Sequence, residues 1–333
     1  MYPDAPREPG LSATLFSAWT DALRRNDFER AWDLSDLSLR ASRNSSAIGR
    51  TEERHLQRIW RGDGLTDKRV LIRCYHGLGD TIQFIRFAKP LREIAREVIV
   101  WGQPALLSLL RDVEGIDRLV ALHDGTPDVE FDVDIEVMEL AHALRATAQL
   151  ISGSVPYLGR GRSERPQPGA SPLSIGLVWE AGHWNGARSV PVRLLAPLAE
   201  QTGARLLSLQ QGPGRLMADS IPARDVAVAD VEALAARIMT LDLIITVDTM
   251  VAHLAGALGA PVWTMLHRDC DWRWPVRGRE TIWYPTMKLF HQNRVGDWTN
   301  VIEEIIAELK AFGRVHAASI DVRSGSKPRT GCE

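Results

Sequence analysis

The sequence predicts an α/β protein with two similar halves, and three observations carry this prediction. Strand-like segments alternate with helical segments from residue 69 onward, and the alternation begins again at residue 173. A stretch rich in Pro, Gly, Ser and Arg lies between the two runs, at residues 156–173. Strands separated by helices favour parallel βαβ units, and a stretch of this composition favours a linker. We therefore expect two α/β halves joined by a linker.

Each half contains four strand-like segments. In the first half we expect strands at 69–76, 97–102, 118–122 and 131–138, with helices from Thr81, from Pro104 and from Ala141. In the second half we expect strands at 173–182, 204–212, 241–248 and 260–266, with helices from Pro191, Val231 and Met250 and over 300–312. Several of the strand-like segments are near-continuous apolar runs, as strands buried on both faces of a parallel sheet are.

The two ends of the chain depart from this pattern. Residues 11–60 carry helical periodicity and predict two short helices, which make up a helical prefix at residues 1–60. The tail at 314–333 lacks a hydrophobic period and is expected to be disordered. The predicted domains are then 61–155 for the first half and 174–313 for the second.

Composition excludes several classes of partner. The chain is 45% hydrophobic and 25% charged, and its formal net charge is −2, which is typical of an ordinary globular protein. No global field draws it to nucleic acid or to a membrane surface. Its most apolar stretch is interrupted by Asp248 and His253. We therefore expect no nucleic-acid partner and no integral membrane segment.

Cysteine usage indicates the compartment. Cys74, Cys270 and Cys332 are far apart and show no metal-type spacing, which suits unpaired thiols in a reducing environment. The first residues are rich in Pro and lack the apolar core of a signal peptide. A cytoplasmic location is the expectation.

A glycine turn with a carboxylate joins the first strand to its helix. His76 precedes the turn, Gly77 and Gly79 shape it, and Asp80 ends it. Ligands of open α/β sheets bind outside the carboxyl ends of the strands, where glycines allow close approach to the backbone. Asp80 can cap the helix by accepting backbone N–H groups, or it can act as a general base toward a substrate hydroxyl. The sequence leaves both roles open.

The same turn disfavours nicotinamide binding. The segment GLGDTI lacks the third glycine of the dinucleotide fingerprint, and no acidic residue ends the second strand.

A second candidate site follows the strand at 241–248. Asp248 and Thr249 can cap the helix from Met250, whose first N–H groups then remain available to an anion. His253 lies four residues after Thr249, on the same side of the helix, and can donate to a phosphate or a sugar hydroxyl. The alternative for His253 is a hydrogen-bonded core histidine.

Two further loops can contribute to a ligand site. Arg188 follows the first strand of the second half and can bind a diphosphate with paired hydrogen bonds, or it can be a solvated loop residue. Gln210 or Gln211 can reach a base or a ribose.

The last candidates come from the segment at 269–298, which is rich in Trp and Arg. We expect most of it to be structural packing, with Asp271 and Arg273 facing a cleft. No Asp-x-Asp motif lies at the end of a strand, so no metal site is expected.

Taken together, the motifs resemble those of glycosyltransferase family 9, the heptosyltransferase-like group, and especially its members linked to tetratricopeptide repeats. The resemblance runs from about residue 55 to 312. The segments that carry it are HGLGDTIQFIRF, SVPVRLLAPL, LDLIITVDTMVAHLAGALGAPVWTML, DWRWP, WYPTMKLF and GDW.

The resemblance implies a GT-B architecture, in which two Rossmann-like domains face a central cleft. It assigns the acceptor to the N-terminal domain and a nucleotide-diphospho-sugar to the C-terminal one. Asp80 matches the aspartate regarded as the catalytic base of the family, beside His76 and the glycine turn. The segment from Asp248 to His253 matches the family's diphosphate segment, which places Thr249 and Met250 near the phosphates.

The predicted function is therefore an inverting, metal-independent transfer of a sugar to an acceptor hydroxyl, with the nucleotide-sugar as co-substrate and no other cofactor. The acceptor class stays open among glycans, glycosides and proteins, and so do the donor sugar and its base. Competing hypotheses are a non-catalytic nucleotide-sugar-binding module and an enzyme that hydrolyses or epimerises nucleotide sugars. A nicotinamide-dependent oxidoreductase is a more distant alternative.

Overall fold

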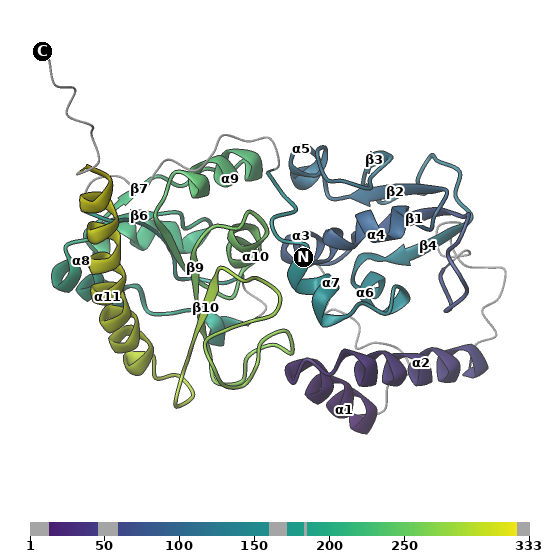
Figure 1. Ribbon diagram of the computed structural model, residues 1–333, viewed down its shortest axis with the longest axis horizontal. Helices are drawn as coiled ribbons and strands as arrows, with labels where there is room; N and C mark the ends of the chain where they lie inside the picture. Colours follow the sequence, from purple (N-terminus) through teal and green to yellow (C-terminus); the bar gives the residue numbers. More distant parts are fainter. Residues whose placement is uncertain (1–12, 46–58, 160–171, 183–184, 325–333) are drawn as a thin grey trace, which may run out of the picture.

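The computed structural model describes residues 13–45, 59–159, 172–182 and 185–324. It contains two parallel sheets, a four-stranded one in the N-terminal half and a six-stranded one in the C-terminal half. Figure 1 shows the two halves side by side, with the prefix helices against the N-terminal half. Most of the predicted linker, at 160–171, lies outside the described residues. The α/β class predicted from the sequence is confirmed.

The N-terminal sheet has the order β3-β2-β1-β4, and all of its neighbouring strands are parallel. Val70 of β1 pairs with Val98 of β2 and with Val133 of β4, and all three are buried. Its strands are β1 (Arg69–Arg73), β2 (Glu97–Gly102), β3 (Arg118–Ala121) and β4 (Val133–Glu136). Its helices are α3 (Leu78–Phe84), α4 (Ala88–Arg92), α5 (Leu107–Leu110), α6 (Leu140–Ala143) and α7 (Ala148–Gly153), with short 3-10 turns before α4, α5 and α6.

The helix expected from Thr81 begins earlier and is interrupted. It starts at Leu78, so that Asp80 lies in its first turn, and a 3-10 turn at Ile85–Phe87 separates α3 from α4. Pro90 explains the interruption, because it has no N–H to donate to the carbonyl of Arg86.

The C-terminal sheet has the order β10-β9-β8-β5-β6-β7, again all parallel. Its strands are β5 (Ser174–Val178), β6 (Arg205–Ser208), β7 (Ala223–Asp225), β8 (Leu243–Val247), β9 (Val262–Leu266) and β10 (Met287–His291). Its helices are α8 (Ala196–Thr202), α9 (Val231–Met239), α10 (Met250–Ala257) and α11 (Thr299–Ser324). The two strands that we did not predict, β7 and β10, are the edges of the sheet, where polar residues interrupt the apolar run.

The tail expected to be disordered from residue 314 is helical as far as Ser324, because α11 continues through it. Its missing hydrophobic period does not prevent a helix, since no Pro or Gly stands between Gly313 and Gly325. Residues 325–333 lie outside the described residues.

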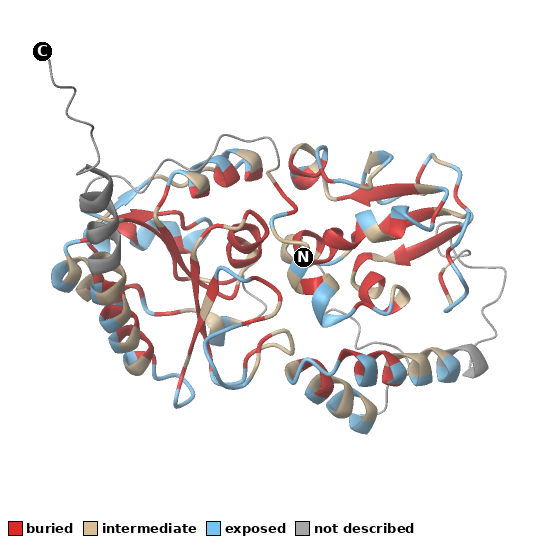
Figure 2. Ribbon diagram, in the orientation of Figure 1, coloured by how far each residue is buried: buried red, intermediate tan, exposed pale blue. Residues whose placement is uncertain are grey.

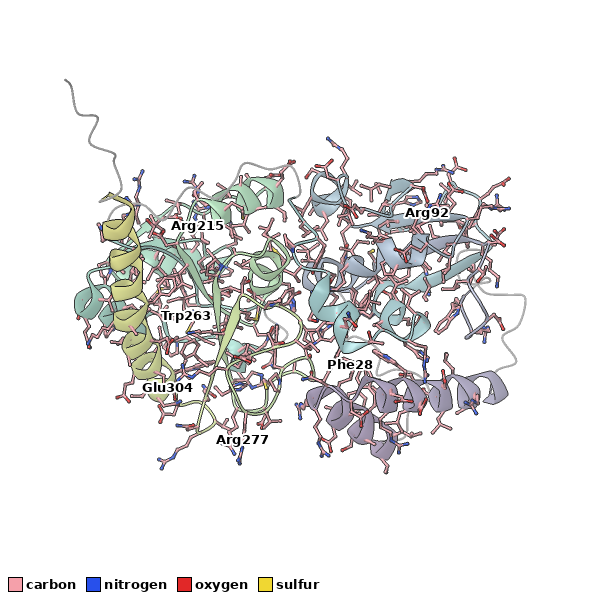
Figure 3. The ribbon with its side chains drawn as sticks, in the orientation of Figure 1. Phe28, Arg92, Arg215, Trp263, Arg277 and Glu304 are labelled. Atoms are coloured by element: carbon pink, nitrogen blue, oxygen red, sulfur yellow. The ribbon has the colours of Figure 1, made fainter. Side chains whose placement is uncertain are left out.

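The prefix contains the two expected helices, α1 (Ala13–Arg24) and α2 (Phe28–Ser45). Trp32 donates its Nε1–H to the carbonyl of Ala146 in the N-terminal half at 2.9 Å. Arg24 donates to the carbonyl of Cys270 in the C-terminal half at 2.7 Å. Phe28, labelled in Figure 3, lies edge-on to Trp283, with ring centroids 6.2 Å apart. The prefix therefore packs on both halves.

One apolar core runs through the prefix, the N-terminal half and the near side of the C-terminal half. It includes Trp32, Ile82, Leu254 and Tyr284, all buried. Figure 2 shows the same pattern, with buried residues along both sheets and along α10. Within the described residues, no helix is long and apolar enough to cross a membrane.

Arg86 is a buried cation that ties three parts of this core together. It donates to the carbonyls of Gln83, Ile151 and Trp283, at 2.8, 3.1 and 2.8 Å, and to the hydroxyl of Tyr157 at 3.0 Å. Its guanidinium also lies 4.6 Å from the ring centroid of Tyr157. Buried carbonyls that lose a donor cost the free energy of an unmade hydrogen bond.

We predict that Arg86→Met lowers the free energy of unfolding by about 3 kcal/mol, because it leaves several buried acceptors without a donor. Urea denaturation followed by circular dichroism measures this loss. The matched control is Arg92→Met, since Arg92 (Figure 3) is 42% exposed and pairs with Asp117 at the surface. Such a pair contributes about 0–1 kcal/mol. Equal losses for the two variants would contradict the assignment of Arg86 as a structural tie.

Candidate active site between the two halves

A cavity of about 460 Å³ lies between the two halves, at the carboxyl ends of β1, β5, β6 and β8. The carboxyl ends of parallel strands lie at the same edge of a sheet, so loops that are far apart in the sequence meet there. The charged residues that line it are Asp80, Glu180, Arg188, Asp248, Asp271 and Arg273. Gly77, Gly79, Gln210, Gln211, Thr249, Met250 and His253 also line it.

Asp80 combines the capping role with a position in the cavity. Its Oδ2 accepts the backbone N–H of Gly77 at 3.0 Å, and its Oδ1 accepts from Nη2 of Arg273 in the other half. Its side chain is 25% exposed, and a carboxylate oxygen has two lone pairs, so each oxygen can accept a further proton donor. Capping and reaction with a ligand hydroxyl are therefore compatible in this geometry.

Gly79 lets helices α3 and α10 approach closely. A Cβ at this position would lie 2.9 Å from Cδ2 of His253 and 3.5 Å from Cα of Met250. Real Cβ atoms essentially never come that close to a ring carbon. The absence of a side chain at residue 79 thus allows the first turns of α3 and α10 to lie beside the same cavity.

His253 is a buried neutral histidine. Its Nδ1 lies 2.9 Å from the hydroxyl of Tyr284, and its ring stacks on Trp274 with centroids 5.6 Å apart. Burial, reinforced by the nearby Arg273, lowers the pKa of His253 well below its usual value of 6.5. Nothing in the sequence pattern indicated Trp274 or Tyr284 as its partners.

The helix α10 begins at a capped end that faces the cavity. The hydroxyl of Thr249 accepts the N–H of Val251 at 3.3 Å, which satisfies one of the first N–H groups of the helix. The positive end of the helix dipole lies here. The N–H of Ala252 is also bonded, to the carbonyl of Thr249 at 3.0 Å, so an anion placed at this end would be stabilised mainly by the helix dipole.

Asp248 and Arg188 form a second pair across the C-terminal half. Nη1 of Arg188 donates to the carbonyl of Asp248 at 2.9 Å and lies 3.9 Å from its Oδ2. Burial, with the neighbouring Asp271, raises the pKa of Asp248 to about 6, although Arg188 opposes the shift. Burial also lowers the pKa of Arg188.

Two predicted site residues are placed differently from what the sequence suggested. Gln210 lines the cavity, but its amide holds the loop after β5: its Oε1 accepts the N–H groups of Trp179 and Glu180, both at 2.9 Å. His76 does not line the cavity, and its ring lies 3.9 Å from Glu136. Gly77, Gly79, Asp80, Arg188, Asp248, Thr249, Met250 and His253 all meet at the cavity, as the sequence led us to expect of residues in one site.

Arg273 is the residue whose importance the sequence understated. It donates to Asp80, to Gln83 at 2.6 Å and to Asp271 at 2.9 Å, and its side chain is only 9% exposed. Burial opposes its charge, but Asp271 and Asp80 outweigh that effect and raise its pKa. In the sequence, only its position just past the strand at 260–266 indicated that Arg273 faces the cleft.

Among the described residues, no three or more His, Cys, Asp and Glu side chains gather in a way that could hold a metal ion.

The comparisons with known proteins identify the fold. No family model matches the chain. The chain is 24% identical to Protein FlbA of Caulobacter vibrioides over 358 aligned positions, which cover 92% of this chain but 57% of FlbA. The chain thus spans less than two thirds of the length of that relative.

Among solved structures, a glycosyl transferase family 9 protein from Veillonella parvula aligns with a TM-score of 0.53 at 12% identity, over 76% of this chain and 99% of the other. The ADP-heptose lps heptosyltransferase II of E. coli aligns with a TM-score of 0.49 at 14% identity, over 73% and 99%. The likeness to the Veillonella structure shows a shared fold, and the predicted GT-B architecture of two Rossmann-like units is confirmed.

The raised pKa of Asp248 predicts a specific pH dependence of stability. Its pKa is about 6 in the folded protein, against an ordinary value of 3.8. Between pH 3.8 and about pH 6 the folded state therefore binds more protons than the unfolded state. The contribution of Asp248 to stability therefore falls as the pH rises through this window. We expect the stability of the wild type relative to Asp248→Asn to fall by about 1 kcal/mol between pH 5 and pH 8.

Urea denaturation of both proteins at several pH values measures this difference, and taking the difference removes the titrations that the two proteins share. Asp242→Asn, compared with the wild type by the same urea denaturation, serves as the control. A difference between wild type and Asp248→Asn that stays constant across the window would contradict the raised pKa.

Proposed function

We propose that the protein is a glycosyltransferase of the heptosyltransferase-like family 9 type, which moves a sugar from a nucleotide-diphospho-sugar to an acceptor hydroxyl. One observation carries this proposal. A carboxylate from the N-terminal half, Asp80, lies in the same cavity as a capped helix N-terminus and two guanidinium groups. A group that can accept a proton and groups that can stabilise a departing anion are the two requirements of such a transfer.

The donor side of the proposed site is the C-terminal half. The N-terminal end of α10 at Thr249 and Met250 would hold the diphosphate, with Arg188 and Arg273 close by. His253, being neutral and buried, would support the helix rather than carry charge. Gln210 would act by shaping the loop after β5, because its own amide is already hydrogen-bonded.

The acceptor side is the N-terminal half. Asp80 would take the proton of the acceptor hydroxyl while the oxygen of that hydroxyl attacks the anomeric carbon. The bond from that carbon to the diphosphate oxygen breaks in the same step, and the negative charge leaves with the nucleoside diphosphate. A single displacement of this kind inverts the configuration at the anomeric carbon.

The proposed reaction uses no metal and no resident cofactor, with positive charge supplied by Arg188, Arg273 and the helix dipole. Glycans, glycosides and proteins are the acceptor classes that we propose to test. The two thiols described by the structure, Cys74 and Cys270, are free and buried, which suits a reducing compartment. We therefore propose that the protein acts in the cytoplasm.

A second function is favoured by the contacts of Asp80 itself. Both of its oxygens already accept hydrogen bonds, from Gly77 and from Arg273, and such contacts suit a structural carboxylate. A module that binds a nucleotide-sugar without turning it over would need the helix at Thr249 but no base. Replacing Asp80 therefore distinguishes the two functions, because only the transferase needs a base.

We predict that Asp80→Asn strongly lowers turnover while donor binding survives. The amide oxygen can still accept the N–H of Gly77, so the cap is kept while the base and the ion pair with Arg273 are lost. The donor is first chosen by thermal shift against a panel of nucleoside diphosphates and their sugars. Release of nucleoside diphosphate from that sugar, with water or an acceptor as nucleophile, should then fall about 100-fold or more, as loss of a general base predicts.

Asp112→Asn is the matched control, because Asp112 is an exposed aspartate of the same half. Equal loss of binding and turnover in Asp80→Asn would assign Asp80 to capping alone. A wild type that binds the donor but never releases the diphosphate would favour the non-catalytic module.

Metal independence gives a separate prediction. Turnover in excess EDTA should stay within about twofold of the untreated rate, because guanidinium groups and a helix dipole can stabilise the leaving group without a cation. The assay is the same release of nucleoside diphosphate, with and without added Mg²⁺ or Mn²⁺. Activity that disappears in EDTA and returns with one of these ions would overturn this part of the proposal.

A further inference from the structure

We propose that helix α1 of the prefix belongs functionally to the active site, because Trp19 and Arg24 hold the loop that positions Arg273. This inference rests on the proposed function for the role of Arg273 in turnover. It assigns Trp19 and Arg24 as positioning residues, since neither of them lines the cavity.

The first link joins α1 to the loop that follows β9. Arg24 donates from Nη2 to the carbonyl of Cys270 at 2.7 Å. The ring of Trp19 lies 5.0 Å from that of Trp272, at an interplanar angle of 57°. Two residues of α1, five positions apart, therefore contact the backbone and a side chain of one four-residue segment, 270–273.

The second link joins Trp272 to Arg273. The guanidinium carbon of Arg273 lies 4.4 Å from the centroid of the Trp272 ring, a cation–π distance. Trp272 thus has Trp19 and the guanidinium of Arg273 as close neighbours. Phe84 and Trp283 lie further away, at 6.3 and 6.5 Å. Removing the Trp19 ring would leave Trp272 without its nearest aromatic neighbour.

The third link is the position of Arg273 between the two halves. It reaches from the C-terminal half to Asp80 and Gln83 of α3, and within its own loop it binds Asp271. An arginine side chain has many rotamers, so a single orientation at this point requires contacts on several sides. Two aromatic faces lie beside the guanidinium, Trp272 at 4.4 Å and Phe84 at 5.7 Å, and α1 contacts the nearer one.

The prefix can transmit geometry because α2 is attached to the other half. Asp36 lies 2.7 Å from His142 and pairs with Arg145, and Trp32 binds the carbonyl of Ala146. The Trp19 indole also donates to Ser35 of α2 at 3.0 Å. The segment 270–273 is thus fixed relative to the half that carries Asp80, by a route that does not pass through the cavity.

The experiment compares Trp19→Ala with two related variants. Trp19→Ala should lower the kcat of nucleoside-diphosphate release about tenfold, because a guanidinium displaced by a fraction of an ångström stabilises the leaving group less well. Trp19→Phe keeps an aromatic ring and should restore most of that rate. Asp21→Ala removes a side chain of the same helix that is 57% exposed and lies outside this route, and it should change kcat less than twofold.

A double-mutant cycle tests whether Trp19 acts through Arg273. In an Arg273→Ala background, Trp19→Ala should cost less than about twofold, since the residue that it positions is already absent. A full tenfold further loss would show that the effect of Trp19 does not pass through Arg273 and would overturn the proposal.

A spectroscopic measurement separates this inference from the proposed function. The Nε–H of Arg273 is buried against Gln83 and should give a distinct side-chain resonance in arginine-labelled protein, identified by its loss in Arg273→Lys. Trp19→Ala should shift or broaden it, and Asp21→Ala should not. An unchanged resonance in Trp19→Ala overturns the positioning role. A changed resonance in a protein that turns over no donor supports positioning and overturns the proposed function instead.

Discussion

The close approach of α3 to α10 is the constraint on which the rest of the site depends. Gly79 has no side chain, and His253 fills the space that a Cβ would occupy. The two helices belong to different halves, and each begins at the carboxyl end of a strand, so their contact brings two strand ends to one cavity. A larger residue at position 79 would clash with His253 and press against the backbone of α10 at Met250.

The contact between α3 and α10 also brings charged residues of the two halves into one cavity. Four carboxylates and two guanidinium groups line it, which by themselves do not favour an anion. The excess remains although Arg273 binds both Asp80 and Asp271, because a carboxyl with a pKa of about 6, as Asp248 has, is still mostly ionised at pH 7. A diphosphate would therefore depend on the positive end of α10 as much as on side-chain charge.

The fold and much of the site could be predicted from the sequence because both depend on local rules. Apolar runs between helical segments located eight of the ten strands in the part of the chain that the structure describes. Residues at strand ends such as Asp80, Arg188 and Thr249 meet at one cavity, as parallel topology favours. His76 was an exception, because it does not line the cavity. Position at a strand end also does not determine which neighbour a side chain binds, and Gln210, which lines the cavity, holds the loop after β5.

The contact between the prefix and Arg273 could not be predicted for a physical reason. Helical periodicity shows that Trp19 lies on an apolar face, but not which surface covers that face. Its partner, Trp272, comes from the far end of the chain and from a loop with no period of its own. Covering either ring is favourable wherever a complementary surface exists, so the sequence favours the partial burial of both rings and the three-dimensional fold determines that they meet. Their meeting beside Arg273 is what connects a peripheral helix to the chemistry of the cavity.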